Sequence, residues 1–334
     1  DQEKLVLDGG ALVGPDVVAV ARKGLQVTIG NHSLELMEAS RATVEEATAS
    51  STPTYGINTG LGALSTTPIS TEQLALLQMN LLRSHAAGVG EPLPDEIVRG
   101  MMVILAASLC RGLSGVRTEI AKLLAGMLNA NVTPVIPSRG SVGASGDLAP
   151  LAHLALVLCG EGNAKLGEKV IPGKAAIAAS GLEPIVPTAK EGLALINGTH
   201  MMSSIATLAL TDISVICEAA VIATAMSIDA AKATDTFLDD RLHAARGQSG
   251  QQTVAASIRD HLKNSSIIPS HKEDDKRVQD PYSFRCSPQV LGASIEAIAR
   301  ITGIISAELG AVTDNPLVFP DDNAIISGGN FHGM

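Results

Sequence analysis

Apolar residues recur along much of the chain at the three- and four-residue spacing of one helix face. The later apolar stretches are long, rich in Ala and Ile and nearly free of Gly and Pro, as in a helical bundle. Earlier helices are expected to begin at Pro15 and Ser33. Ser70 begins another, because Gln73 three residues later completes a capping box. The remaining periodic stretches are 94–109, 117–129, 147–159, 198–234, 252–263 and 288–312.

Extended structure is predicted at two places only. Residues 5–12 contain a short strand, and 163–172 form a hairpin with Gly167-Glu168 at its centre. The chain is loop-rich up to residue 196 and consists of long helices after it. We therefore predict a mainly α protein with two domains, 1–196 and 197–334.

The composition supports packed helices and excludes several functions. Of the 334 residues 46% are hydrophobic but only 2% aromatic, with no Trp, so Ala, Leu, Ile, Val and Met must fill the core. A net charge of −10 without any Lys/Arg-dense run argues against nucleic-acid and anionic-membrane partners. The apolar stretch 201–226 is interrupted by Asp212 and Glu218, which favours a buried bundle helix over a membrane span.

Cysteine usage and the N-terminus suggest a reducing compartment. The four cysteines are widely spaced and mostly lie in apolar helical patterns, which predicts buried thiols and neither disulfides nor a zinc site. No secretory signal, paired-His metal motif or phosphate-binding glycine motif is present, so we expect a cytoplasmic protein without metal or nucleotide. The cysteines are Cys110, Cys159, Cys217 and Cys286.

The segment 140–151 is a glycine- and serine-rich loop that leads into an apolar helix. Asp147 is placed to cap that helix at Leu148. On composition alone the segment is an ordinary linker and cap. The tripeptide Ala144-Ser145-Gly146 offers an alternative, because a tight bend would let the Gly146 nitrogen attack the Ala144 carbonyl carbon. Loss of two waters would then leave a five-membered ring with an exocyclic methylidene, an electrophile made from the chain itself.

The sequence GSVGASGDLAPLAH around this tripeptide resembles the signature of the aromatic amino acid ammonia-lyase family, and its flanks resemble the histidine ammonia-lyase branch. Further family motifs recur in order from Tyr55 to Phe331. The resemblance implies a fumarase/aspartase-like helical fold. It also implies that Ala144, Ser145 and Gly146 form a 4-methylidene-imidazol-5-one (MIO) prosthetic group.

Elimination of ammonia from an amino acid needs an electrophile for the amine and a base for the weakly acidic β-proton. The resemblance of 54–60 to the family motif TYGINTG implies that Tyr55 is the base. Without the resemblance, Tyr55 is a hydroxyl bonded within a glycine-rich turn. His85 matches a position that selects the substrate ring; histidine-acting enzymes carry His there, as some tyrosine-acting ones do, whereas phenylalanine-acting ones are generally apolar. A lone His at a helix end is otherwise a surface residue.

The segment 195–200 opens the first long helix. Asn197 matches a family residue that contacts the ring and the substrate, and as an alternative it caps the helix. His200 stands where a histidine ammonia-lyase is expected to have Gln. Phe331, in the motif GGNFH, is expected near the ring or as a structural aromatic.

A third cluster lies at 278–286. A guanidinium fork suits bidentate capture of an α-carboxylate, so we expect Arg285 to anchor the substrate. The resemblance implies that Gln279 and Tyr282 line the site and assist proton transfer. The alternative is a salt bridge between Asp280 and Arg285 that only holds the loop. The charged stretch 270–276 is expected to be a lid or a solvated loop.

The resemblance implies an ammonia-lyase that converts L-histidine to trans-urocanate and ammonia. A tyrosine or phenylalanine ammonia-lyase or aminomutase is the second hypothesis, and an incomplete, non-catalytic helical scaffold is the third. The sequence ends at Met334, where family members continue through further helices that supply an acidic site residue, so truncation is expected. Family enzymes are homotetramers whose sites draw on neighbouring subunits, and we expect self-association here.

Overall fold

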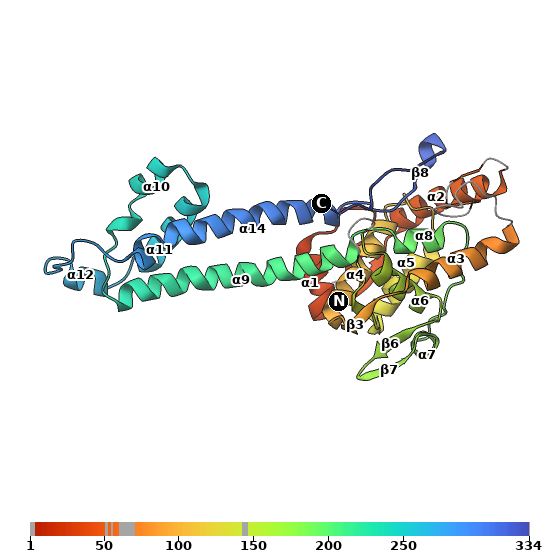
Figure 1. Cartoon of the computed structure of the whole chain (residues 1–334), viewed down its shortest axis with the longest axis horizontal. Helices are drawn as coiled ribbons and strands as arrows, with labels where there is room; N and C mark the ends of the chain where they lie inside the picture. Colours follow the sequence, from red (N-terminus) through yellow and green to blue (C-terminus); the bar gives the residue numbers. More distant parts are fainter. Residues whose placement is uncertain (1–3, 51–52, 55, 60–70, 142–145, 334) are drawn as a thin grey trace. The chain divides into compact units, whose positions relative to one another are not determined.

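The computed structural model describes residues 4–50, 53–54, 56–59, 71–141 and 146–333. Most of them are helical, which confirms the predicted mainly α class (Figure 1). The chain forms two compact units, Asp1–Thr207 with Ile305–Met334 (unit 1) and Leu208–Ile304 (unit 2). The domain boundary expected at 196/197 stays a prediction, since compact units need not coincide with domains.

Unit 1 is built around helix α4, whose side chains are buried from Val98 to Leu109. Helices α1 and α5 pack against it, and Met101, Met102 and Leu105 fill the core in place of aromatics. The helices of this unit are α1 Gly14–Lys23, α2 Asn31–Ala49, α3 Thr71–His85, α4 Asp95–Leu109, α5 Thr118–Asn129, α6 Leu148–Leu158, α7 Gly173–Ala179 and α8 Glu191–Ile196.

Short strands complete unit 1. The predicted hairpin is confirmed: β6 pairs antiparallel with β7, and Gly167 takes a φ of +59° in the two-residue turn. It lies against α7 (Figure 1). The strand pairs are β1 Leu5–Leu7 parallel to β2 Val27–Ile29, β3 Val89–Pro92 antiparallel to β5 Pro137–Arg139, β4 Val132–Pro134 with β6 Asn163–Leu166 and β7 Lys169–Pro172, and β8 Leu317–Phe319 with β9 Ala324–Ile326.

Unit 2 has a smaller core made by Val221, Ile228, Phe237, Val254 and Ile258. Its helices are α10 Asp240–Arg246, α11 Ser249–Leu262, α12 Ile267–His271 and α13 Tyr282–Arg285, together with parts of α9 His200–Ala230 and α14 Ser287–Leu309, each of which contributes residues to both units.

Helices α9 and α14 expose many apolar side chains. Val215 and Ile216 are each 64% exposed, Met226 66% and Val290 65%. Contacts within the described chain therefore do not bury 201–226 as the sequence pattern predicts. Helix α9 and the stretch Tyr282–Leu309 are also long and apolar enough to cross a bilayer. The helices of a bundle meet the same two criteria, length and composition.

Candidate active site

Gly146 is held in a bend that only glycine fits. Its φ is +67°, and it forms an isolated bridge with Gly198. A Cβ added at Gly146 would lie 2.0 Å from the Gly198 carbonyl oxygen and 3.0 Å from the Phe331 carbonyl oxygen. The nitrogen needed for ring closure thus belongs to a residue in a left-handed conformation beside Gly198. Ala144 and Ser145 lie outside the described residues.

Asp147 does not cap its own helix, and the sequence prediction is wrong on this point. Its backbone N–H donates to the Gly198 oxygen (2.8 Å), and its side chain turns to the start of α9. There Oδ2 accepts hydrogen bonds from the N–H groups of Met201 (2.8 Å) and Met202 (3.0 Å), which lack partners within the first turn. Asp147, directly after Gly146, therefore ties the start of α6 to the N-terminus of α9. Burial raises the pKa of Asp147, although the N–H groups of Met202 and Met201 act in the opposite direction.

His200 occupies the first turn of α9 and is 3% exposed. Neither Nδ1 nor Nε2 has a hydrogen-bond partner among the residues that the structure describes. Its ring lies against Gly198, because a Cβ added to Gly198 would be 2.3 Å from the His200 Cε1. Burial lowers the pKa of His200 to about 4, so the imidazole is neutral at pH 7.

Replacement of His200 by Gln is expected to flatten the stability of the protein between pH 6.5 and pH 4. The folded pKa of about 4 lies below the ordinary 6.5, so the unfolded state binds the proton more readily. The free energy of unfolding of the wild-type protein is therefore highest above pH 6.5. It falls by as much as about 3 kcal/mol as the pH is lowered to 4. Urea unfolding followed by far-ultraviolet circular dichroism measures this loss.

The comparison with His200→Gln isolates this contribution, because the raised pKa of Asp147 acts in the opposite sense as the pH falls. Equal pH dependence of both proteins would show that His200 is not buried as a neutral imidazole.

Asn197 is placed by a buried ion pair. Its Nδ2 donates to the Asn315 carbonyl oxygen (2.9 Å) and approaches Asp314 Oδ1 (3.5 Å). Asp314 Oδ2 lies 2.5 Å from Lys190 Nζ, and these side chains are 4% and 0% exposed. The Asn197 amide nitrogen is therefore committed to the segment around Asp314 and Asn315. Its Oδ1 remains available to accept a hydrogen bond.

His85 ends α3. Its Nδ1 lies 2.9 Å from the Leu81 carbonyl oxygen and 3.1 Å from the Ser84 hydroxyl. Because the carbonyl can only accept, this contact favours the tautomer with the proton on Nδ1 and Nε2 as the acceptor. Nearby, Gly88 donates its N–H to His153 Nε2 on α6 (3.1 Å). Burial lowers the pKa of His153, which favours the neutral imidazole that this contact requires.

The same helix, α6, joins the His85 segment to the ring-forming loop. A Cβ added at Gly140 would lie 3.0 Å from the Ala149 Cβ on α6 and 3.2 Å from the Gly88 Cα. The segment that follows His85 therefore packs where the loop enters, and α6 begins directly after Asp147.

Tyr55 lies outside the described residues, but its neighbours are well anchored. Asn58 Oδ1 accepts the Thr54 N–H (2.7 Å), and its Nδ2 donates to the carbonyl oxygens of Ala47 and Ser50 (3.1 Å each). Asn58 thus fixes the glycine-rich turn to the end of α2. Sequence reasoning missed this residue, although Asn in such a turn commonly bonds to nearby backbone.

The third predicted cluster lies in unit 2. Gln279 is exposed and Tyr282 is 72% exposed. The Arg285 guanidinium stacks on the Tyr282 ring at 4.7 Å, and its Nε donates to the Asp280 carbonyl oxygen (2.6 Å). The alternative interpretation, a salt bridge between the Asp280 and Arg285 side chains, is not what the structure has: the Asp280 carboxylate accepts from Thr234 N (2.9 Å) and lies 3.7 Å from Arg277.

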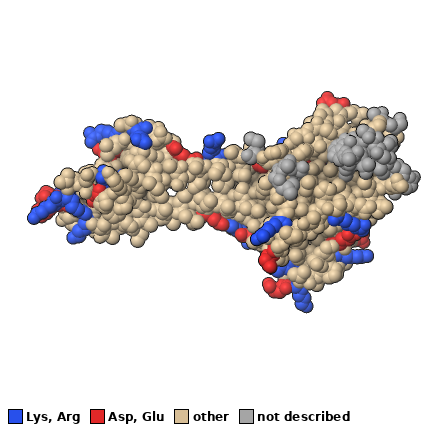
Figure 2. All heavy atoms as spheres, in the orientation of Figure 1, with Lys and Arg blue, Asp and Glu red and all other residues tan. Residues whose placement is uncertain are grey.

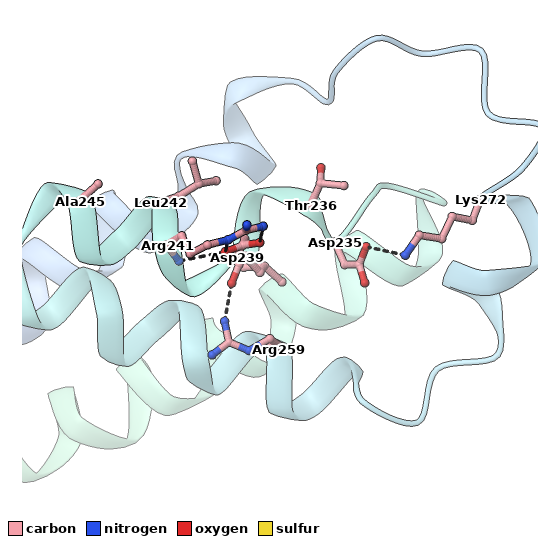
Figure 3. A pocket seen from close by; sticks show the side chains of 9 residues that line it. Asp235, Thr236, Asp239, Arg241, Leu242, Ala245, Arg259 and Lys272 are labelled. Atoms are coloured by element: carbon pink, nitrogen blue, oxygen red, sulfur yellow. Dashed lines mark hydrogen bonds and ion pairs between the residues drawn. The ribbon is translucent and has the colours of Figure 1, made fainter.

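A hollow of about 810 Å³ also lies in unit 2, and its cations are already paired. Arg241 contacts Asp239 and Lys272 contacts Asp235 (Figure 3). It therefore offers no free cation for a substrate carboxylate.

Within the described ranges no group of His, Cys, Asp and Glu could hold a metal ion. There the cysteines are free thiols, and only Cys110 is fully buried.

Three predicted residues thus meet in unit 1: Gly146, Asn197 and Phe331, with the His85 segment reached through α6. Gln279, Tyr282 and Arg285 gather in unit 2. The structure adds residues that the sequence did not single out. They are Asn58, His153, Lys190, Gly198 and Asp314.

The mostly helical chain has the fold of ammonia-lyases and aminomutases of known structure. The chain belongs to the aromatic amino acid lyase family, whose model matches residues 12–334. It is 49% identical to the histidine ammonia-lyase of Gloeobacter violaceus over 99% of its own length and 64% of that protein. The histidine ammonia-lyase structure from Trypanosoma cruzi matches with a TM-score of 0.88 and 40% identity, over 99% of this chain and 61% of that one. The tyrosine aminomutase of Streptomyces globisporus matches with a TM-score of 0.90 and 32% identity, over 99% and 66%. The chain therefore spans about two thirds or less of each of these proteins.

Proposed function

We propose that the protein is a carbon-nitrogen lyase that eliminates ammonia from L-histidine to give trans-urocanate. The observation that carries this proposal is Gly146, held with a φ of +67° against Gly198 where no side chain would fit. It ends the Ala-Ser-Gly tripeptide in a chain similar to histidine ammonia-lyases over nearly its whole length.

The residues around Gly146 fit an MIO group formed from Ala144, Ser145 and Gly146. Gly146 has a left-handed bend beside Gly198, and the next residue, Asp147, is fully buried with its carboxylate bound to the start of α9. When formed, the group supplies an electrophile for the substrate amine.

The side chains of the chain itself do the remaining work. Tyr55 takes the β-proton as base, and Arg285 binds the α-carboxylate as a bidentate donor. His85 Nε2 accepts the N–H of the substrate imidazole, since its Nδ1 is committed to Leu81. Asn197 Oδ1 accepts from the substrate amine. Phe331 lines the site. Gln279 and Tyr282, with Tyr282 assisting proton transfer, reach it together with Arg285 from a neighbouring copy, as in the family, whose sites draw on neighbouring subunits.

Incubation of the purified protein with L-histidine, followed by ultraviolet absorbance, tests the proposal. We expect the absorbance of urocanate to rise, against a low protein background because the chain has no Trp and two Tyr. A flat trace from protein whose tripeptide has lost two waters would contradict a histidine substrate.

A tyrosine or phenylalanine ammonia-lyase or aminomutase is the second candidate, supported by the similarity to the Streptomyces globisporus tyrosine aminomutase. A parallel assay with the three amino acids discriminates them. The third candidate, a non-catalytic scaffold, predicts a tripeptide of unshifted mass.

We also propose that the protein self-associates as a homotetramer in the cytoplasm. The support is the row of exposed apolar side chains on α9 and α14, which a second copy or further helices would cover.

Figure 2 shows Lys/Arg and Asp/Glu interspersed among uncharged residues on the described surface in view, which does not suit a nucleic-acid partner.

A further inference from the structure

The segment that follows His85 is held by a side chain from another helix. Helix α3 ends at His85, and the N–H of Ala86 still bonds to the Leu82 carbonyl oxygen in helical fashion (3.0 Å). Two residues later, the N–H of Gly88 donates to His153 Nε2 on α6 (3.1 Å), 65 positions away in the sequence. Backbone N–H groups are bonded mostly by backbone carbonyl oxygens, so an imidazole acceptor at this point needs a reason.

Close packing makes this hydrogen bond possible. A Cβ added at Gly88 would lie 3.0 Å from His153 Nε2 and 3.3 Å from the Pro137 Cβ, so a larger residue would push the backbone away from the imidazole. Gly140 packs there too, since its added Cβ would be 3.2 Å from the Gly88 Cα and 3.0 Å from the Ala149 Cβ, one helical turn earlier on α6. The chain is therefore seated between α6 and β5 at this point.

The hydrogen bond from His153 reaches His85 in two short steps. The His85 carbonyl oxygen accepts the Ala87 N–H (2.8 Å), which closes a turn, and the next N–H along the chain is the one that His153 holds. The His85 side chain is restrained at the same time, because its Nδ1 lies 2.9 Å from the Leu81 carbonyl oxygen. The direction of His85 Nε2 therefore depends on where this turn is held.

We propose that His153 is a positioning residue for recognition of the substrate imidazole. By holding Gly88 it fixes the turn after His85, and thereby the direction in which His85 Nε2 meets the substrate N–H. It acts through His85 and not on the substrate itself. The inference rests on the proposed function, since it names the residue that sets the substrate class of that same site.

A positioning role of this kind has a kinetic signature. The bonds that change during elimination lie at the α- and β-carbons of the substrate, and the imidazole ring is recognised alike in the bound substrate and in the transition state. Loss of such uniform binding raises KM and leaves kcat nearly unchanged. A purely structural role of His153 would lower the stability of the protein without this separation of KM from kcat.

The test compares His153→Leu, which removes the acceptor, with His153→Gln, whose Oε1 lies as many bonds from Cα as Nε2 does and accepts the Gly88 N–H. We expect KM for L-histidine to rise about tenfold in His153→Leu, with kcat within about threefold of wild type. His153→Gln should keep a KM within about threefold of wild type. Urocanate absorbance over a range of L-histidine concentrations gives both constants.

Asn129→Leu is the matched control. Asn129 Oδ1 also accepts a backbone N–H, that of Val27 in β2 (2.8 Å), and its Nδ2 donates to the Val27 carbonyl oxygen (2.8 Å). This variant should lower the urea concentration of unfolding, as His153→Leu does, because both leave backbone groups without their side-chain partner. Its KM should stay at the wild-type value, since β2 carries none of the proposed site residues.

A double-mutant cycle shows whether His153 acts through His85. In the His85→Ala background, His153→Leu should change KM by less than about twofold. A wild-type KM in folded His153→Leu overturns the inference while the proposed function stands, and so does a full tenfold rise in the His85→Ala background. An equal rise in the Leu and Gln variants overturns it as well.

Failure of the proposed function has a different result. A wild-type protein that forms no urocanate contradicts that function, and the inference with it. Circular dichroism checks folding of every variant; if His153→Leu does not fold, the flexible apolar His153→Met carries the same expectation.

Discussion

Gly146→Ala should abolish ring formation and reduce turnover of L-histidine by at least about a thousandfold. An added Cβ would lie 2.0 Å from the Gly198 oxygen, and the φ of +67° disfavours any side chain. The backbone must therefore leave its left-handed bend beside Gly198, on which the proposed ring closure depends. The measurement is the mass of the tripeptide-containing peptide together with the rate of urocanate formation.

The matched control is Gly167→Ala in the turn between β6 and β7. Gly167 has a similar φ of +59°, but no atom lies within 4 Å of an added Cβ. It carries the same backbone strain without the clash, so the ring should form as in wild type. A closed ring in Gly146→Ala would show that the contact with Gly198 does not control the chemistry.

Asp314→Asn should lower the free energy of unfolding by about 3–5 kcal/mol, because it leaves the buried Lys190 ammonium without a carboxylate. The two groups lie 2.5 Å apart and are almost completely buried. Since Asp314 also approaches Asn197, activity should fall together with stability. Urea unfolding followed by circular dichroism measures the loss.

Glu161→Gln is the control for this pair. Glu161 contacts Arg83 at the same distance, 2.5 Å, but with side chains 37% and 49% exposed. Exposed pairs contribute little, so this variant should unfold near the wild-type urea concentration. Similar losses in both variants would contradict the structural role assigned to Lys190 and Asp314.

Local signals predicted the elements of the fold well. The spacing of apolar residues placed α4, α5 and α6, and Gly167-Glu168 placed the β6–β7 hairpin. Each of these features depends on residues close in the chain. The strands β3 and β5 were missed because their pairing joins segments far apart in sequence.

The sequence predicted the types of residue at the site, but not the hydrogen bonds and ion pairs that hold them in place. Asp147 precedes an apolar helix, so local sequence favours a cap there, yet its carboxylate binds Met201 and Met202 more than fifty positions later. The Lys190–Asp314 pair spans 124 positions, and no local pattern signals it. The missing partners of His200 can be recognised only when its whole surroundings are known. The roles of Tyr55, Ala144 and Ser145 stay predictions, because these residues lie outside the described part of the chain.

The mass of the peptide that contains residues 144–146 in the wild-type protein tests the central claim most directly. The account predicts a mass lower than that encoded by the sequence by two waters, with the loss mapped by fragmentation to Ala144, Ser145 and Gly146. A peptide of the encoded mass, from protein that circular dichroism shows to be folded, would contradict it.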